Sequence, residues 1–283
     1  MTFWEKFAVI DPRWIFLGMA VLLTFPVLSP LGLAITIDQE TTVPIYNWIE
    51  NLNPGDIVFA DVSFSGGSEG ELGPQLQAWF RHCLQKGVKV VWVAQWNTGE
   101  RLGYNMCVEV TEKLEEEGIH TEYGVDWVYV GWKAGGTTMW RNMQIDFWDA
   151  CAGTDMLGNS FDDLPLMERV RKWDKETCKG IMLFTAGSPG VPTYTTYFHD
   201  YDIYLGDVAV QVPGNMNLLR SGQIKGILCG LPGAAQYEIL LEKPGRAVKL
   251  MDAQSLGHLW IMVLVILGNI GFYVRRKSGT PVD

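Results

Sequence analysis

The sequence has few histidines and no closely spaced pair of cysteines. Most metal sites and many catalytic sites with a nucleophile depend on these residues. The chain of 283 residues has four histidines and five cysteines, and no two cysteines form a C-x-x-C pair. No two histidines have the H-x-x-x-H spacing of a zinc site. The odd number of cysteines leaves at least one thiol unpaired, and their apolar surroundings favour free thiols over a disulfide framework. We therefore expect no metal site, no disulfide framework and no cofactor.

Positive charge is also scarce between the two ends of the chain. The net charge is −10, and five basic and three acidic residues lie outside 38–252. The segment 38–252 therefore carries 17 basic and 29 acidic residues, a net charge of −12. A nucleic-acid-binding surface needs clustered Lys and Arg, and this segment has no run of basic residues. Nucleic acid is excluded as a partner.

Motifs of nucleotide binding and of serine hydrolysis are missing as well. No loop matches G-x-G-x-x-G or the P-loop pattern. The segment Ala186–Gly190 resembles a nucleophile elbow around Ser188, but Pro189 follows and has no N–H to stabilise an oxyanion. None of the four histidines falls in a predicted strand-end loop. We expect no catalytic triad and favour a protein that is not an enzyme, although a pair of Ser188 with Lys133 remains open.

Two long uncharged apolar stretches are what the sequence does contain. They cover 14–37 and 253–274, and a helix needs about 20 apolar residues to cross a bilayer. We predict a transmembrane helix in each, with a short N-terminal tail at 1–13 and a basic C-terminal tail at 275–283. Pro26 and Pro30 predict a kink, or the end of the regular helix, in the second half of the first stretch.

The distribution of basic residues predicts the orientation. Five basic residues flank the spans on the side of the two termini, whereas the domain side has Lys243, Arg246 and Lys249. Cytoplasmic flanks carry the excess of Lys and Arg. We therefore expect an integral membrane protein with both termini in the cytoplasm and an extracytoplasmic domain over 38–252.

The segment 38–252 alternates buried strands with amphipathic helices. Short apolar runs rich in β-branched residues are separated by patterns with helical spacing. This alternation predicts an α/β domain with a mostly parallel, Rossmann-like sheet of about six strands and helices on both faces. The expected strands are 57–62, 88–93, 127–130, 180–184, 208–212 and 224–229. The expected helices are 45–52, 76–84, 106–117, 138–151, 167–173, 194–201 and 216–221.

The loops that follow the predicted strands are rich in glycine and hydroxyl side chains. Ligands of open parallel sheets bind outside the carboxyl ends of the strands, where glycine lets a ligand approach backbone N–H groups. Lys133 supplies a counter-charge for an anion in one such loop. The same loops are expected in any fold of this type, so their turn residues alone do not prove a site. The candidate ligand-binding residues are Asp61, Ser65, Gly67, Lys133, Gly135, Thr137 and Ser188.

Several segments resemble an uncharacterised family of membrane-anchored proteins with a Rossmann-like soluble domain between two transmembrane helices. They are FPVLSPLGLAITI, LNPGDIVFADVSF, RHCLQKGVKVV, YVGWKAGG and SGQIKGILCGLPGAAQYE, which together extend over most of the chain. The resemblance implies the architecture, and it implies no activity, because fold alone does not determine function.

Three hypotheses about function remain. The first is a membrane-tethered binding or scaffold subunit that assembles with other membrane protein subunits or with itself, supported by the two anchors and by twelve tryptophans. The second is an extracytoplasmic module that senses a small molecule or an anion. The third is a hydrolase or transferase in the strand-end loops, with Ser188 or Asp61 as the reactive residue. All three include the lipid bilayer as a partner.

Overall fold

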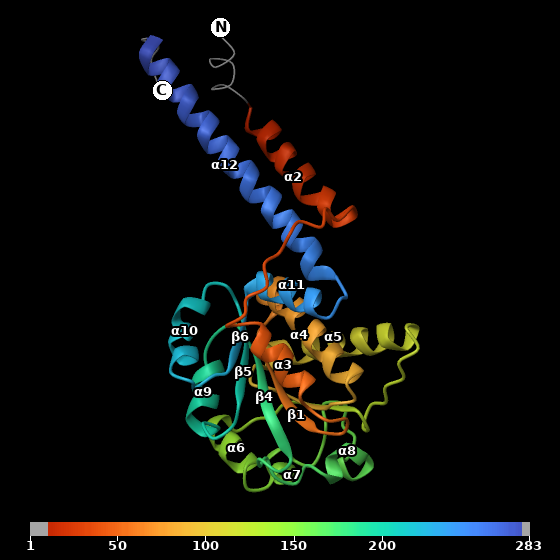
Figure 1. The fold of residues 1–283 in the computed structure, drawn as a ribbon. Helices are drawn as coiled ribbons and strands as arrows, with labels where there is room; N and C mark the ends of the chain where they lie inside the picture. Colours follow the sequence, from red (N-terminus) through yellow and green to blue (C-terminus); the bar gives the residue numbers. More distant parts are fainter. Residues whose placement is uncertain (1–10, 279–283) are drawn as a thin grey trace. The chain divides into compact units, whose positions relative to one another are not determined.

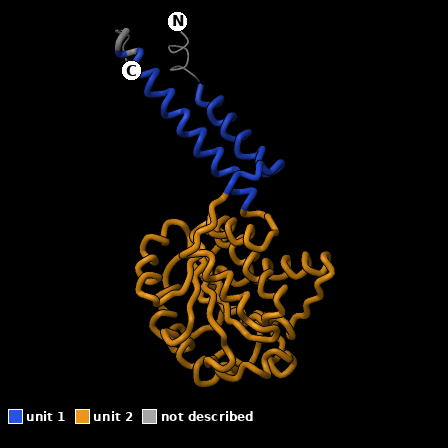
Figure 2. Tube along the Cα trace, in the orientation of Figure 1, with its two compact units in different colours: residues 1–34, 248–283 blue, residues 35–247 orange. Residues whose placement is uncertain are grey.

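The structure is a computed structural model that describes residues 11–278 (Figure 1). Most of the predicted tails, 1–13 and 275–283, lies outside the described residues. Contacts within the chain divide it into two compact units. One comprises residues 1–34 and 248–283, and the other comprises residues 35–247 (Figure 2). We call the second unit the body.

The body is built on one parallel six-stranded sheet with the strand order β3-β2-β1-β4-β5-β6. This order is that of doubly wound α/β folds, in which the chain leaves the central strand first in one direction and then in the other. The predicted α/β class with a mostly parallel, Rossmann-like sheet is confirmed. The strands are β1 Ile57–Ser63, β2 Lys89–Ala94, β3 Trp127–Trp132, β4 Cys178–Thr185, β5 Ile203–Asp207 and β6 Gly226–Cys229.

Helices cover both faces of the sheet, and each face has its own hydrophobic core. In β1, Val58 and Ala60 belong to one core, whereas Ile57 and Phe59 belong to the other, as the alternation of side chains along a strand requires. The first core is covered by α3 Val43–Glu50, α4 Glu69–Gln85, α5 Asn97–Glu116 and α11 Gly230–Leu240. The second is covered by α6 Gly136–Met143, α7 Phe147–Ala150, α8 Pro165–Glu168, α9 Gly190–Tyr197 and α10 Val212–Arg220, with the short turn η2 Phe161–Asp163.

The prediction of the fifth strand at 208–212 is wrong. The strand β5 is Ile203–Asp207, paired in register with β4 from Ile181↔Ile203 to Thr185↔Asp207. The later residues, 208–212, are mostly apolar and rich in valine, which is typical of a buried strand, but they lie beyond the end of the neighbouring strand. A strand needs a partner along its whole length, so Val210 is 85 % exposed and the chain turns into α10 at Val212.

The single helix expected at 138–151 is two helices. The first, α6, ends at Met143, and α7 begins after Asp146. The Asp146 carboxylate accepts a hydrogen bond from the backbone N–H of Asp149 at 3.0 Å. Asp146 is therefore the N-cap of a new helix rather than a residue inside a long one.

In the other unit, the described residues contain one helix that is long and apolar enough to cross a membrane, judged by length and composition. It covers Arg246–Val274 within α12 Arg246–Ser278. The first apolar stretch forms a shorter helix, α2 Pro12–Leu28, which contains Pro26 and ends two residues after it. The fully buried Asp252 carboxylate accepts hydrogen bonds from the backbone N–H groups of residues 31–33 at 2.8, 3.0 and 3.1 Å. The segment that follows α2 is thereby attached to α12.

Candidate functional site

Two hollows lie at the carboxyl ends of the strands, where parallel sheets bind ligands. The first, which we call the β3-side hollow, has a volume of about 230 Å³ and is lined by residues from the ends of β2 and β3, from α6 and from α9. The second, the β5-side hollow, has a volume of about 370 Å³ and is lined by residues that follow β4 and β5. Pro189 lines the first hollow and Ser188 lines the second, so the loop after β4 contributes to both.

The predicted ligand residues are distributed over this edge. Lys133 and Thr137 line the β3-side hollow, and Gly135 is the N-cap residue of α6 at the same place. Ser188 lines the β5-side hollow. Lys133 and Ser188 thus belong to different hollows, which does not favour a catalytic pair. Ser65 and Gly67 line neither hollow.

Lys133 is a cation without an anionic partner among residues 11–278. Its Nζ atom is 3.3 Å from the carbonyl oxygen of Asp155 and 3.4 Å from Oγ1 of Thr154, and both contacts are long. The first turn of α6 has no side-chain cap, and Gly136 of this turn lines the same hollow as Lys133. Gly135 allows this arrangement, because its φ of 135° lies in the region that favours glycine. An ammonium group and free helix N–H groups together favour an anion.

Beneath this hollow, Asp61 is fully buried in the centre of the sheet. Its side chain lies on the same face of β1 as Phe59, toward α6 and α9. The Ser63 hydroxyl donates a hydrogen bond to the carboxylate, and the backbone N–H of Gln95 donates a second at 2.9 Å. Burial raises the pKa of Asp61 to about 7, because removal from water costs the charged form more than these donors restore.

Two further polar side chains complete what we call the polar floor, which consists of Asp61, Ser63, Gln95 and Tyr194. The hydroxyl of Tyr194 lies close enough to Asp61 and Gln95 to affect the pKa of Asp61, but among the described residues neither it nor the buried side-chain amide of Gln95 has a partner in good hydrogen-bond geometry. Gln95 lines the hollow, and the Tyr194 ring lies 5.4 Å from the ring of Trp140, which also lines it. Each unpaired buried polar group costs about 1–3 kcal/mol, so their concentration here is typical of a functional site.

The loop after β1 is less suited to an anion than its glycines indicate. This loop leads into α4, whose first turn contains Glu69 and Glu71. The Glu71 carboxylate accepts a hydrogen bond from the backbone N–H of Ala209 at 2.8 Å, and Glu69 forms an ion pair with Arg246. These carboxylates already offset the positive end of the helix and would repel a phosphate. The strand order of dinucleotide-binding folds is present here without their phosphate site.

The β5-side hollow has a buried carboxylate of its own. Asp207, at the end of β5, is fully buried and accepts a hydrogen bond from Nδ2 of Asn215 at 2.7 Å, and Asn215 lines the hollow. Its Oδ1 atom has no partner among the described residues, and burial raises the pKa of Asp207 to about 6.

Four polar side chains at this edge of the sheet are not among the residues predicted from the sequence: Gln95, Tyr194, Asp207 and Asn215. Gln95 directly follows a predicted strand, so the rule that selected Asp61 and Lys133 could have found it. Asp207 was missed because the fifth strand was placed after it. Tyr194 and Asn215 lie in helices, and only the packing of α9 and α10 brings them to this edge. All five cysteines are free thiols, and within residues 11–278 no three His, Cys, Asp or Glu side chains are grouped so that they could hold a metal ion.

No family model, curated protein or solved structure matches this chain.

Proposed function

We propose that this chain is a membrane-tethered α/β module that binds a small organic carboxylate in the β3-side hollow. The observation that carries the proposal is the convergence of an unpaired cation, Lys133, and the uncapped start of α6 on one hollow. A carboxylate there would gain a charged partner and backbone donors at once.

The other lining residues support a ligand with a short apolar part. Thr137 and Thr193 add hydroxyl groups, whereas Trp132, Met139 and Trp140 add apolar walls. The volume of about 230 Å³ lies below the range of about 300–1,000 Å³ that holds drug-sized ligands. A molecule of the size of an amino acid or a hydroxy acid fits such a space better than a nucleotide does.

The tether is part of the proposal. We infer that α12 crosses the bilayer and that α2 makes the second crossing with the residues that follow it. The 17 residues of α2 extend about 26 Å at 1.5 Å per residue, slightly less than the bilayer core of about 30 Å. Both termini are then cytoplasmic, and the body lies outside. Digestion of the body by protease added only from the cytoplasmic side would contradict this orientation.

The full chain in detergent tests the binding function. We expect at least one of glutamate, lactate, succinate and benzoate to raise the melting temperature of the wild type and to bind measurably by calorimetry. The variant Lys133→Gln should lose about tenfold or more in affinity, because a charged hydrogen bond contributes about 1.5–3 kcal/mol. Lys172→Gln, an exposed lysine away from the hollow, is the matched control. Equal affinities of the two variants would contradict the proposal.

A second candidate function, a scaffold subunit, is favoured by the apolar side chains that the body exposes. Val210 and Trp132, beside the two hollows, are 85 % and 40 % exposed, and Ile145 is 70 % exposed. A partner subunit or a second copy that covers them would remove apolar surface from water. Light scattering of the full chain measures its assembly, and a monomer that co-purifies with no other membrane protein would count against this function.

A further inference from the structure

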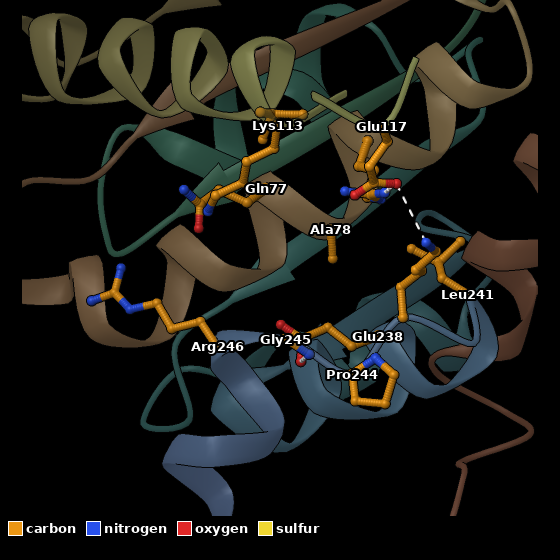
Figure 3. Close-up of a pocket in the computed structure, with 12 residues that line it drawn as sticks. Gln77, Ala78, Lys113, Glu117, Glu238, Leu241, Pro244, Gly245 and Arg246 are labelled. Carbon is orange, nitrogen blue, oxygen red and sulfur yellow. Dashed lines mark hydrogen bonds and ion pairs between the residues drawn. The ribbon is translucent and has the colours of Figure 1, made fainter. Parts of the chain in front are cut away.

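A groove on the outer surface of the helical layer brings four basic side chains together in an otherwise acidic body. It has a volume of about 210 Å³ and lies between α4, α5, α11 and the segment that leads into α12 (Figure 3). Its lining includes Arg81, Lys113, Lys243 and Arg246, against the carboxylates of Glu117 and Glu238. Each of these cations is paired with a carboxylate, Arg81 and Lys243 with Glu117 and the other two with Glu109 and Glu69 beside the groove.

The two cations at one end of the groove share a single oxygen atom. Oε2 of Glu117 forms ion pairs with Nη2 of Arg81 and with Nζ of Lys243, the latter at 3.3 Å. The hydrogen bond from Arg81 lowers the pKa of Glu117. Glu117 is the C-cap residue of α5, where the helix dipole disfavours a negative charge. The cations therefore hold this carboxylate in a place where the helix does not favour it.

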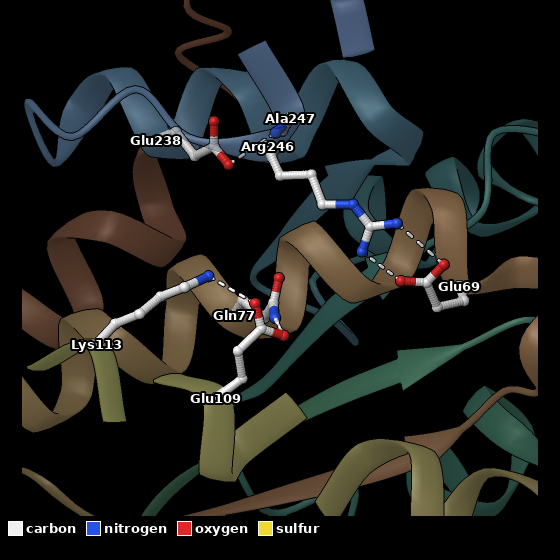
Figure 4. A network of polar contacts seen from close by, with 7 residues as sticks. All are labelled: Glu69, Gln77, Glu109, Lys113, Glu238, Arg246 and Ala247. Atoms are coloured by element: carbon white, nitrogen blue, oxygen red, sulfur yellow. Dashed lines mark hydrogen bonds and ion pairs between the residues drawn. The ribbon is translucent and has the colours of Figure 1, made fainter. Parts of the chain in front are cut away.

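The other polar side chains in the groove are held by residues beside it (Figure 4). Glu109 accepts hydrogen bonds from Lys113 at 2.6 Å and from Gln77 at 2.8 Å, and Arg246 contacts both carboxylate oxygens of Glu69. The Glu238 carboxylate accepts hydrogen bonds from the backbone N–H groups of residues 245 and 247 at 2.8 and 2.9 Å. Glu238 thus fixes the chain where α12 begins. Within residues 11–278, Glu117 has no comparable backbone donors, and its side chain is 37 % exposed.

We propose that this groove binds a phosphate group, which replaces the Glu117 carboxylate between Arg81 and Lys243. Arg81 and Lys243 already converge on one oxygen position, and Lys113 lines the same groove. The tetrahedral oxygens of a phosphate can accept from several cations at once, whereas a carboxylate offers two coplanar oxygens. Arg81 also has a buried Nε–H without a partner among the described residues, and a second phosphate oxygen can accept from it.

The phosphate can belong to a soluble phosphate ester or to a phospholipid headgroup. Ala78, Val110 and Leu241 form an apolar part of the lining, which suits either an ester group or the glycerol region of a lipid. This site lies on the helical layer that faces away from the β3-side hollow, so it does not depend on the proposed carboxylate function.

Two variants of the full chain in neutral detergent test the site, because they should change the affinity for phosphate in opposite directions. Lys243→Gln removes one of the two cations and should weaken binding about tenfold, which is about 1.4 kcal/mol. Glu117→Gln removes the competing charge and should tighten binding several-fold. Both side chains are partly exposed, so neither variant should unfold the body. The probes are inorganic phosphate and dihexanoyl phosphatidic acid, measured by calorimetry at constant ionic strength in chloride.

Matched controls separate this site from general electrostatics and from the other hollow. Glu116→Gln changes the neighbouring, exposed charge outside the groove and should leave the affinity unchanged, as should Lys133→Gln. Binding of phosphatidic acid alone would assign the site to lipid, and binding of inorganic phosphate would assign it to soluble phosphates. The proposal is overturned if neither probe binds the wild type or Glu117→Gln, or if Glu116→Gln tightens binding as much as Glu117→Gln does.

Discussion

Replacement of Asp61 by asparagine should remove a large contribution to the pH dependence of stability in the body. The pKa of this carboxyl is about 7 in the folded chain, against an ordinary value of 3.8. Folding thus favours the protonated form of Asp61. The contribution of this group to the free energy of unfolding is fully present below pH 3.8 and is lost as the pH rises toward 7. The difference between the two values corresponds to about 4 kcal/mol, at about 1.4 kcal/mol per pH unit.

Part of this loss falls in an accessible pH range. Between pH 5 and pH 8, Asp61 should lower the free energy of unfolding by about 2.7 kcal/mol, because two pH units separate pH 5 from its folded pKa. Asp207, whose pKa is about 6, should lower it by about 1.4 kcal/mol more. Urea unfolding of the full chain in detergent, followed by tryptophan fluorescence, measures both contributions.

The expected result is that the free energy of unfolding falls by about 2.7 kcal/mol less in Asp61→Asn than in the wild type between pH 5 and pH 8. Asp163→Asn, at an exposed position, is the matched control and should behave as the wild type. If Asp61→Asn kept the full decrease, the carboxyl would not be desolvated, and the polar floor as described would be incorrect.

Two further outcomes follow from the contacts. Asp252→Ala should raise the hydrogen-exchange rates of the backbone amides of residues 31–33 at least about tenfold, because the buried carboxylate is their acceptor and each such bond contributes about 1.5–3 kcal/mol. The control Gln254→Ala, at an exposed position of the same helix, should leave these rates unchanged. Equal rates in the two variants would contradict the attachment of this segment to α12. Lys133→Gln should change the free energy of unfolding by less than about 0.5 kcal/mol, since its contacts are long, and a larger loss in urea unfolding would assign Lys133 a structural role instead.

The class of fold could be predicted because strands of a parallel sheet are covered on both faces. Such strands appear in the sequence as short apolar runs, and β1, β2 and β3 were located to within about two residues. The fifth strand could not be placed this way, since both 203–207 and 208–212 contain suitable apolar residues. Register with β4 selects the first of them.

The candidate site was predictable only in part, for a similar reason. Lys133, Gly135 and Thr137 are close in the chain, so one loop pattern indicated them together. Tyr194 reaches Asp61 because β4 lies next to β1 in the sheet, although more than a hundred residues separate the two strands in the chain.

The sequence by itself determined the type of most elements, the acidic charge of the body and the presence of long apolar segments. Local spacing and composition are enough for these properties, because each depends on residues close together in the chain. Only the tertiary structure decided which loops share a hollow, that Asp61 is removed from water, and that Arg81 and Lys243 converge on Glu117. These properties depend on strand order and helix packing, which bring together side chains that are far apart in the sequence and decide how much water reaches them.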